Sequence, residues 1–209
     1  MSGIYIHIPF CKKACHYCNF HFSTNQNSKS AFIKAVCNEL VLRKSEYISE
    51  EIQSIYFGGG TPTVLEVSEL DMILQVVYKH YKVSDTPEIT LEANPDDLDL
   101  EKIKRLANTK INRLSIGIQS FHESDLSAMN RAHNADEAKK CLEIATAYFD
   151  NITIDLMFGM PSMTVEQWRQ NLQTAFAYGI KHLSCYALTV EPKTALEHFI
   201  RKGSHPPMD

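Results

Sequence analysis

Several features that would place this sequence in a specialised class of protein are missing. No apolar run approaches the roughly 18 residues that a membrane-spanning helix needs. Residues 1–5 include no basic segment followed by a long apolar stretch, so no secretory signal is visible. Glycine and proline number only 8 each, which excludes collagen-like and low-complexity chains. We therefore expect a globular protein of the cytoplasm, where thiols stay reduced.

A surplus of positive charge is also absent. Lysine and arginine number 21 against 25 aspartate and glutamate residues, which gives a net charge of −4. Proteins that bind nucleic acids usually carry excess positive charge, so the composition disfavours that class of partner. The 209 residues, 44% of them hydrophobic, are enough for one large domain with a buried core.

Apolar residues recur with two alternating periods along the chain. Strands are expected at residues 3–8, 53–57, 88–93, 113–118, 152–157 and 182–188, and helices at residues 29–46, 68–81, 99–107, 123–129, 136–148 and 164–178. Ser68 and Asp99 are the expected N-caps of their helices, and a capping box of Thr164 and Gln167 opens the last helix. Right-handed crossovers then predict an α/β fold, a partial (β/α)6 TIM-like barrel with its helices outside.

The expected barrel accounts for residues 1–200, which we interpret as one core domain. Residues 201–209 are polar and include two prolines. This composition is typical of a loop or of a linker between domains. We expect this segment to begin a linker to a C-terminal domain that is absent from these residues.

The six cysteines are spread unevenly. Three lie within eight residues, directly after the first expected strand: Cys11, Cys15 and Cys18. The other three occupy apolar positions of helices or strands and are expected to be small buried residues: Cys37, Cys141 and Cys185. Closely spaced thiolates on a loop suit a soft metal or an iron–sulfur cluster, and three ligands leave one iron of a four-iron cluster open to a small chelating ligand. A zinc ion with His16 or His21 as fourth ligand is the alternative.

Glycines and polar residues also stand at or near the ends of the other expected strands. They are Gly58, Gly59, Gly60 and Thr61 after the second strand, Glu92 and Asn94 at the third, Gln119 at the fourth, Arg131 beyond a short helix, and Asp155 within the fifth. Ligands of parallel α/β folds bind at the carboxyl ends of the strands, so we expect one shared site beside the cysteines. Taken singly, the glycines could form only a sharp turn, and Glu92 or Asp155 could pair with Arg113 or another cation. The glycine run matches neither a dinucleotide-binding nor a P-loop motif.

The cysteine motif and the glycine run together resemble those of the radical S-adenosylmethionine (SAM) superfamily. More narrowly, four segments resemble the oxygen-independent coproporphyrinogen III oxidase family: Tyr5-Ile-His-Ile-Pro-Phe-Cys11, Phe57-Gly-Gly-Gly-Thr-Pro-Thr63, Ser115-Ile-Gly-Ile-Gln-Ser-Phe121 and Ile154-Asp-Leu-Met-Phe-Gly-Met-Pro161. The resemblance extends over nearly the whole chain.

This resemblance implies a [4Fe–4S] cluster on Cys11, Cys15 and Cys18, with SAM chelating its fourth iron. It implies SAM contacts from Tyr5, Tyr17, Gly59, Gly60, Thr61, Glu92, Gln119, Arg131 and Asp155. In that assignment Tyr17 lies near the adenine, the glycine segment receives the amino group and Arg131 faces the carboxylate. No residue beyond the cluster ligands is assigned a catalytic role.

One position separates two branches of the family. The decarboxylating oxidases carry a further cysteine two residues after the third cluster ligand, where this chain has Phe20. The sequence therefore resembles the haem-chaperone branch, whose members deliver haem to target proteins. This implies haem or porphyrin as a ligand, with a haem-accepting protein and an electron donor as partners and no nucleic acid. None of the nine histidines is assigned as a haem ligand.

Two alternatives remain within the superfamily. The first is oxidation of coproporphyrinogen III to protoporphyrinogen IX. That substrate has four carboxylates and requires several cations, whereas the expected strand ends offer chiefly Arg131. The second is another radical SAM enzyme, one that acts on RNA for example, which the acidic balance of the chain disfavours.

Overall fold

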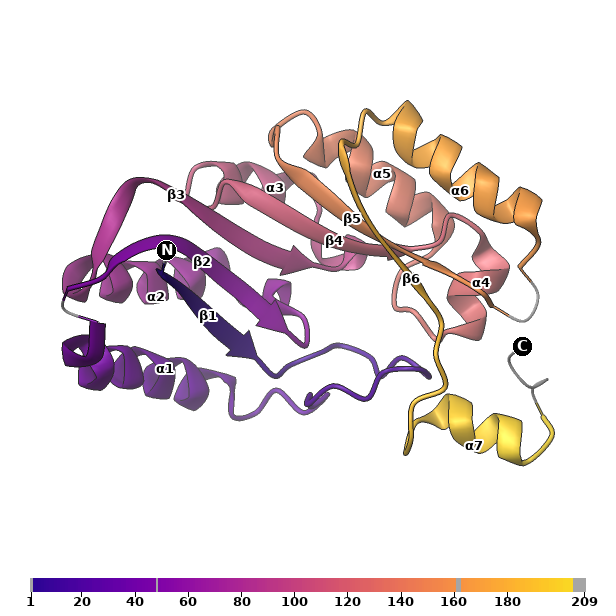
Figure 1. Cartoon of the computed structure of the whole chain (residues 1–209), viewed down its shortest axis with the longest axis horizontal. Helices are drawn as coiled ribbons and strands as arrows, with labels where there is room; N and C mark the ends of the chain where they lie inside the picture. Colours follow the sequence, from indigo (N-terminus) through magenta and orange to yellow (C-terminus); the bar gives the residue numbers. More distant parts are fainter. Residues whose placement is uncertain (1, 48, 161–162, 205–209) are drawn as a thin grey trace.

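The computed structural model describes residues 2–47, 49–160 and 163–204. Six parallel strands form one sheet in the order β1-β2-β3-β4-β5-β6 (Figure 1). The strands are β1 (Ser2–Ile8), β2 (Glu51–Gly59), β3 (Lys82–Ala93), β4 (Arg113–Gln119), β5 (Ile152–Phe158) and β6 (His182–Ala187). Within the described residues β6 does not pair with β1, so the sheet is an open partial barrel. This confirms the predicted α/β class and strand sequence.

Among the described residues, six helices connect the successive strands, and a seventh follows the last strand. They are α1 (Lys29–Arg43), α2 (Val67–His80), α3 (Leu100–Ala107), α4 (Glu123–Ala128), α5 (Ala135–Ala145), α6 (Val165–Ala177) and α7 (Ala195–Arg201). Short 3-10 turns lie at Lys44–Tyr47, Pro62–Val64 and Pro95–Asp97. None of the helices in the described ranges is long and apolar enough to cross a membrane.

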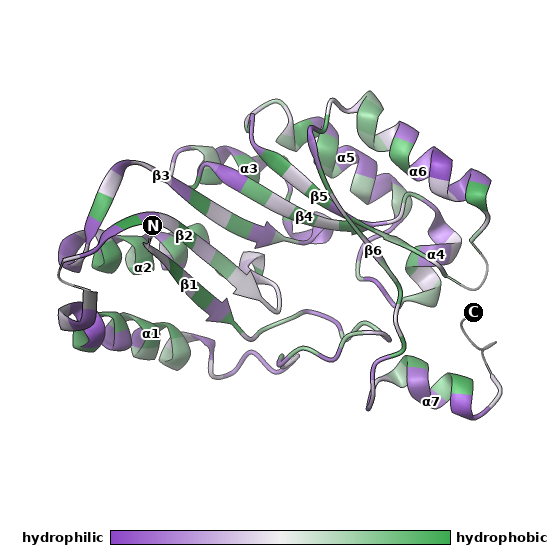
Figure 2. Ribbon diagram, in the orientation of Figure 1, coloured by the Kyte–Doolittle hydropathy of each residue, from purple (hydrophilic) through white to green (hydrophobic). Residues whose placement is uncertain are grey.

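The two faces of the sheet differ sharply in polarity, because successive strand residues point to opposite sides. On β4, Leu114 and Ile116 belong to the buried core shared with the helices, whereas Arg113 and Ser115 line the concave face. Hydrophobic and hydrophilic bands alternate along the strands in Figure 2. The core therefore lies between the sheet and the outer helices, and the concave face is left polar.

A second, smaller apolar cluster lies under the cysteine loop. Its buried members are Leu126, Met129, Met157, Met160, Leu188 and Leu196, and Tyr17 packs against them. These residues come from α4, the end of β5, the segment after β6, and α7. This apolar cluster packs against the cysteine loop through Tyr17, near the carboxyl ends of the strands.

The strand and helix expectations hold with a few corrections. Asp99 caps α3 and Thr164 with Gln167 caps α6, as predicted. Ser68 was wrong as the cap of α2: Glu66 caps this helix in a capping box with Glu69, since buried Val67 is already helical. The short helix α7 was not predicted.

The prediction for the three scattered cysteines is only partly correct. Cys141 is buried, and Cys37 is half-buried against the core. Cys185 is exposed, because it lies on β6 at the edge of the sheet. The predicted linker begins at residue 201, which is the last residue of α7, and its residues 205–209 lie outside the described residues. Pro161, the last residue of the fourth family-like segment, also lies outside them.

Candidate functional site

A cavity of about 710 Å³ runs along the concave face and reaches the carboxyl ends of the strands. Strands β2 to β6 and the loop after β1 line it, and its volume is within the range of small-molecule sites. It brings together Cys11, Cys15, Tyr17, Cys18, Gly59, Gly60, Thr61, Glu92, Gln119, Arg131 and Asp155. The polar strand ends expected from the sequence therefore do converge beside the cysteines.

Tyr5 is the predicted site residue that does not line the cavity. It lies on the edge strand β1 and is 59% exposed. Its ring stacks on Tyr56, with 5.9 Å between the ring centroids, and its hydroxyl lies 3.1 Å from Nδ1 of His7. Tyr5 thus supports Tyr56 from outside the cavity.

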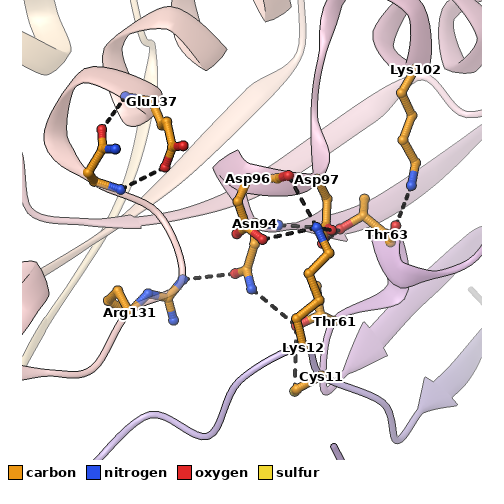
Figure 3. A network of polar contacts seen from close by, with 11 residues as sticks. Cys11, Lys12, Thr61, Thr63, Asn94, Asp96, Asp97, Lys102, Arg131 and Glu137 are labelled. Atoms are coloured by element: carbon orange, nitrogen blue, oxygen red, sulfur yellow. Dashed lines mark hydrogen bonds and ion pairs between the residues drawn. The ribbon is translucent and has the colours of Figure 1, made fainter. Parts of the chain in front are cut away.

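The loop after β1 is anchored through Lys12, between the first two cysteines of the motif. Its ammonium forms ion pairs with Asp96, at 3.1 Å, and with Asp97, both from the turn after β3 (Figure 3). Although burial works to lower the pKa of Lys12, the two carboxylates raise it, so the ammonium stays charged. Asp97 also accepts a hydrogen bond of 2.9 Å from Thr63, which ties the cysteine loop to the segment after β2.

The other side of the loop is held by segments distant in sequence. The backbone N–H of His16 donates to the carbonyl of Met129 at 3.0 Å, and its carbonyl accepts from the N–H of Leu196 in α7 at 2.8 Å. Further along, Asn19 donates to Glu191 at 2.9 Å. The residues after β4 and after β6 therefore close around the cysteines.

The three thiols are half-buried and free of disulfides. The Thr61 hydroxyl donates to Sγ of Cys11 at 3.5 Å, and Nη1 of Arg131 donates to Sγ of Cys15 at 3.4 Å. Burial raises the pKa of the Cys11 and Cys18 thiols. Bound iron would nevertheless deprotonate them, because a thiol that coordinates a metal loses its proton.

Zinc, with His16 or His21 as fourth ligand, stays the alternative for these thiols. Nowhere in these ranges do three Cys, His, Asp or Glu side chains converge as a single metal ion requires. Nδ1 of His16 lies 3.0 Å from the carbonyl oxygen of Ala128, and the ring meets Phe199 edge-on. Ligands of a four-iron cluster bind separate irons and so stand further apart than those of one ion.

Arg131 is the hub of the polar network. Its Nη2 donates to Oδ1 of Asn94 and to the carbonyl of Gly117, both at 2.8 Å, and its Nη1 reaches the Tyr17 hydroxyl at 3.2 Å. Burial opposes the charge, but Tyr17 and Cys15 raise the pKa of Arg131, so the guanidinium stays charged. Its Nε is buried and finds no partner among the described residues. One buried nitrogen of the charged guanidinium is therefore unsatisfied.

Two carboxylates face the cavity from β3 and β5. Glu92 accepts from the Tyr56 hydroxyl at 2.7 Å and from the N–H of Gly59 at 3.0 Å, yet burial raises its pKa. Burial likewise raises the pKa of Asp155 to about 6, while the Ser184 hydroxyl works to lower it. Neither carboxylate forms an ion pair within the described chain, so both can accept hydrogen bonds from a ligand.

The suggested pairing of Glu92 or Asp155 with Arg113 was wrong. Arg113 instead donates to Glu88 at 2.9 Å and to Thr153 at 2.7 Å. It nevertheless lines the cavity, as do Lys13 and His182. The expectation that Arg131 is the chief cation was therefore incomplete. The strand period would have shown Arg113 on the inward face, in phase with Ser115.

The glycines at the end of β2 form a sharp turn and also line the cavity, which are the two roles considered for them. Gly59 has a φ of +114°, a conformation that favours glycine, so the turn requires it. A Cβ on Gly60 would lie 2.7 Å from the carbonyl oxygen of Phe10, and both glycines line the cavity. A tight turn thus presents backbone directly to a ligand.

Gln119 ends β4 with a φ of +65°, in the left-handed region where a non-glycine residue is strained. Its side chain accepts a hydrogen bond of 2.6 Å from Tyr186 on β6. Residue-by-residue analysis missed Tyr186 and Tyr56, which orient Gln119 and Glu92. Both tyrosines stand at alternating strand positions whose side chains face the cavity. This alternation could have identified them from the sequence.

Comparison with known proteins adds a family context. The profile of the radical SAM superfamily matches residues 5–175. The heme chaperone HemW of Bacillus subtilis is 36% identical over 206 residues, which cover 97% of this chain and 54% of that protein. HemW of Escherichia coli is 32% identical over 99% of this chain and 54% of its own length.

A solved structure agrees with this context. Coproporphyrinogen III oxidase (HemN) from Escherichia coli superposes with a TM-score of 0.87 at 25% identity, over 98% of this chain and 48% of that chain. The chain spans about half the length of the curated relatives that it matches.

Proposed function

This chain belongs to the radical SAM superfamily, and from that premise we propose that Cys11, Cys15 and Cys18 hold a [4Fe–4S] cluster beside a SAM site in the cavity. The family implies these two cofactors, and the assignment to individual residues is our proposal. When bound, they supply one-electron cleavage of a carbon–sulfur bond of SAM.

The donor set of the loop fits a cluster. Three half-buried thiols without a fourth cysteine nearby leave one iron position for an exchangeable ligand. Thr61 and Arg131 already donate to two of the sulfurs, and such hydrogen bonds favour the negative charge of iron-bound thiolates.

The cavity also fits SAM. The charged guanidinium of Arg131 lines the cavity and can meet a carboxylate, and an Arg–carboxylate contact is charge-assisted. Glu92 and Asp155 can accept from an ammonium or from ribose hydroxyls. The backbone at Gly59 and Gly60 allows close approach of the amino acid end. These residues bind and orient the ligand, and the walls of the cavity limit its contact with water.

For the whole protein we propose a haem chaperone of the cytoplasm, with haem or porphyrin as ligand and with a haem-accepting protein and an electron donor as partners. The observation that carries this proposal is Phe20, which lines the cavity at the position where the oxidases of the family carry cysteine, and which is 69% exposed. The two relatives named heme chaperone HemW support it. The proposal includes residues 1–200 as the core domain, residues 201–209 as the start of a linker, and a C-terminal domain beyond it.

Coproporphyrinogen III oxidation is the second candidate. The superposition on HemN favours it, and so do the additional cations of the cavity, because Lys13 and Arg113 could meet substrate carboxylates. Phe20 still separates the two candidates.

The cluster is tested first. Anaerobic reconstitution of the protein should yield about four irons per chain and a brown chromophore, since a cubane has four metal positions. Serine at Cys11, Cys15 or Cys18 should abolish it. Cys37→Ser is the matched control, because Cys37 lies in α1 against the core, and it should retain the cluster. One zinc per chain under reducing, iron-replete conditions would contradict the proposal.

Haem binding is tested on the full-length protein. Titration with haem should show saturable binding, and an anaerobic assay with reductant, SAM and coproporphyrinogen III should give no protoporphyrinogen. Multiple-turnover formation of protoporphyrinogen would establish the second candidate instead. A Phe20→Cys variant assayed in parallel tests whether this single position separates the two branches.

A further inference from the structure

A continuous chain of hydrogen bonds links two of the three cysteine sulfurs. It runs from Cys11 through Thr61, Asn94 and Arg131 to Cys15 (Figure 3 shows its first four residues). The two inner contacts are 3.2 Å, from Nδ2 of Asn94 to Oγ1 of Thr61, and 2.8 Å, from Nη2 of Arg131 to Oδ1 of Asn94. Asn94 is therefore the middle of this chain and uses both ends of its amide.

The position of Asn94 is fixed by its own backbone. It directly follows β3 and precedes Pro95, which restricts it to the extended conformation observed, with φ −102° and ψ 146°. Its N–H donates to Oγ1 of Thr63 at 3.4 Å, and its carbonyl accepts from the N–H of Asp97 at 3.0 Å. The side-chain amide consequently projects from a rigid turn.

The amide controls the direction of both outer donors. A threonine hydroxyl has one proton, and because Asn94 donates to Oγ1, that proton is left for the sulfur of Cys11. Arginine is a planar fork, so holding Nη2 between Asn94 and the carbonyl of Gly117 aims Nη1 at Cys15. The third thiol, Cys18, has a backbone donor at Phe20 instead of a side chain.

We propose that Asn94 is a positioning residue that sets the reduction potential of the cluster by orienting the donors to Cys11 and Cys15. The inference rests on the proposed cluster ligands. Hydrogen bonds to the sulfurs stabilise the reduced, more negative cluster and so raise its potential. The role of Asn94 is indirect, since it contacts neither sulfur itself.

The test is a redox titration, followed by electron paramagnetic resonance, of the anaerobically reconstituted protein. Asn94→Ala should shift the midpoint potential to more negative values, with a reduced-to-oxidised ratio about tenfold lower at a fixed potential, which is about 59 mV for one electron. Thr61→Val should shift it in the same direction. In the double variant, the further shift due to Asn94→Ala should be smaller than in the unaltered background, because part of its effect passes through Thr61.

Asn130→Ala is the matched control. Asn130 also anchors the cysteine loop, donating to the carbonyl of Ala14 at 2.7 Å, but it belongs to no chain that ends on a sulfur. It should leave the potential unchanged. If Asn94→Ala does not load a cluster, Asn94→Asp replaces it: this variant keeps the acceptor for Arg131 but draws the Thr61 proton away from Cys11, so its potential should also be more negative.

The outcomes separate this inference from the function on which it rests. A loaded Asn94→Ala or Asn94→Asp protein with unchanged potential would overturn the inference alone. The inference would also be overturned if Asn94→Ala shifted the potential equally in the unaltered protein and in the Thr61→Val background. Absence of a cluster from the unaltered protein would overturn the proposed ligands and, with them, this role of Asn94.

Discussion

Lowering the pH should weaken SAM binding through one identifiable residue, Asp155. Its carboxyl lines the cavity from β5, and burial raises its pKa to about 6. Glu92 raises this pKa further, whereas the Ser184 hydroxyl, Arg131 and Arg113 lower it. In the proposed site this carboxylate accepts hydrogen bonds from SAM, and protonation below pH 6 removes one acceptor and the negative charge. Affinity should therefore fall as the pH falls through this pKa.

The size of the effect follows from the pKa. If only the ionised form binds, the apparent Kd rises about twofold at pH 6 and about tenfold at pH 5, relative to neutral pH. A tenfold change corresponds to about 1.4 kcal/mol. The comparison is best confined to pH 5–7, because the α-amino group of the ligand titrates near pH 8.

Calorimetry on the reconstituted protein checks this prediction, with Asp155→Asn as the variant. The asparagine keeps the shape of the side chain without titrating, so its affinity should be lower at pH 7 and less dependent on pH. An identical pH dependence in both proteins would refute the role assigned to Asp155.

Two other substitutions test the site and the fold. Arg131→Ala removes a charged donor and should weaken SAM binding by about 1.5–3 kcal/mol, roughly 10- to 100-fold, measured by the same calorimetry; unchanged affinity would mean that Arg131 does not contact the ligand. Phe57→Ala, at a fully buried position of β2, should lower the free energy of unfolding by about 3–5 kcal/mol in a denaturant titration; a loss below about 1 kcal/mol would mean that Phe57 is not in the core.

The fold was largely predictable because the strands alternate cleanly, as Leu114, Ile116 and Ile118 do on β4. Errors arose where tertiary contacts outweigh local pattern. Burial of Val67 moved the start of α2 upstream of Ser68. Cys185 has the right period for burial but lies on an edge strand.

The candidate site was predictable in its location but not in its internal contacts. Parallel strands end at one edge, so Glu92 and Gln119 had to lie near the cysteine loop. Their tyrosine partners come from neighbouring or more distant strands, and only the curvature of the sheet brings Tyr186 to Gln119. The roles taken from the family resemblance stay predictions, and Tyr5 lies behind Tyr56 and does not line the cavity.

The closure of the cysteine loop has a consequence for the order of events during synthesis. Cys11 and Cys15 leave the ribosome well before Glu191 and Leu196, which close the loop that carries them. Chains emerge from the N-terminus at about 5–20 residues per second, so these thiols wait on the order of ten seconds or more before their enclosure can form. The cysteine loop therefore cannot acquire its full set of native contacts until the segment after β6 has been made.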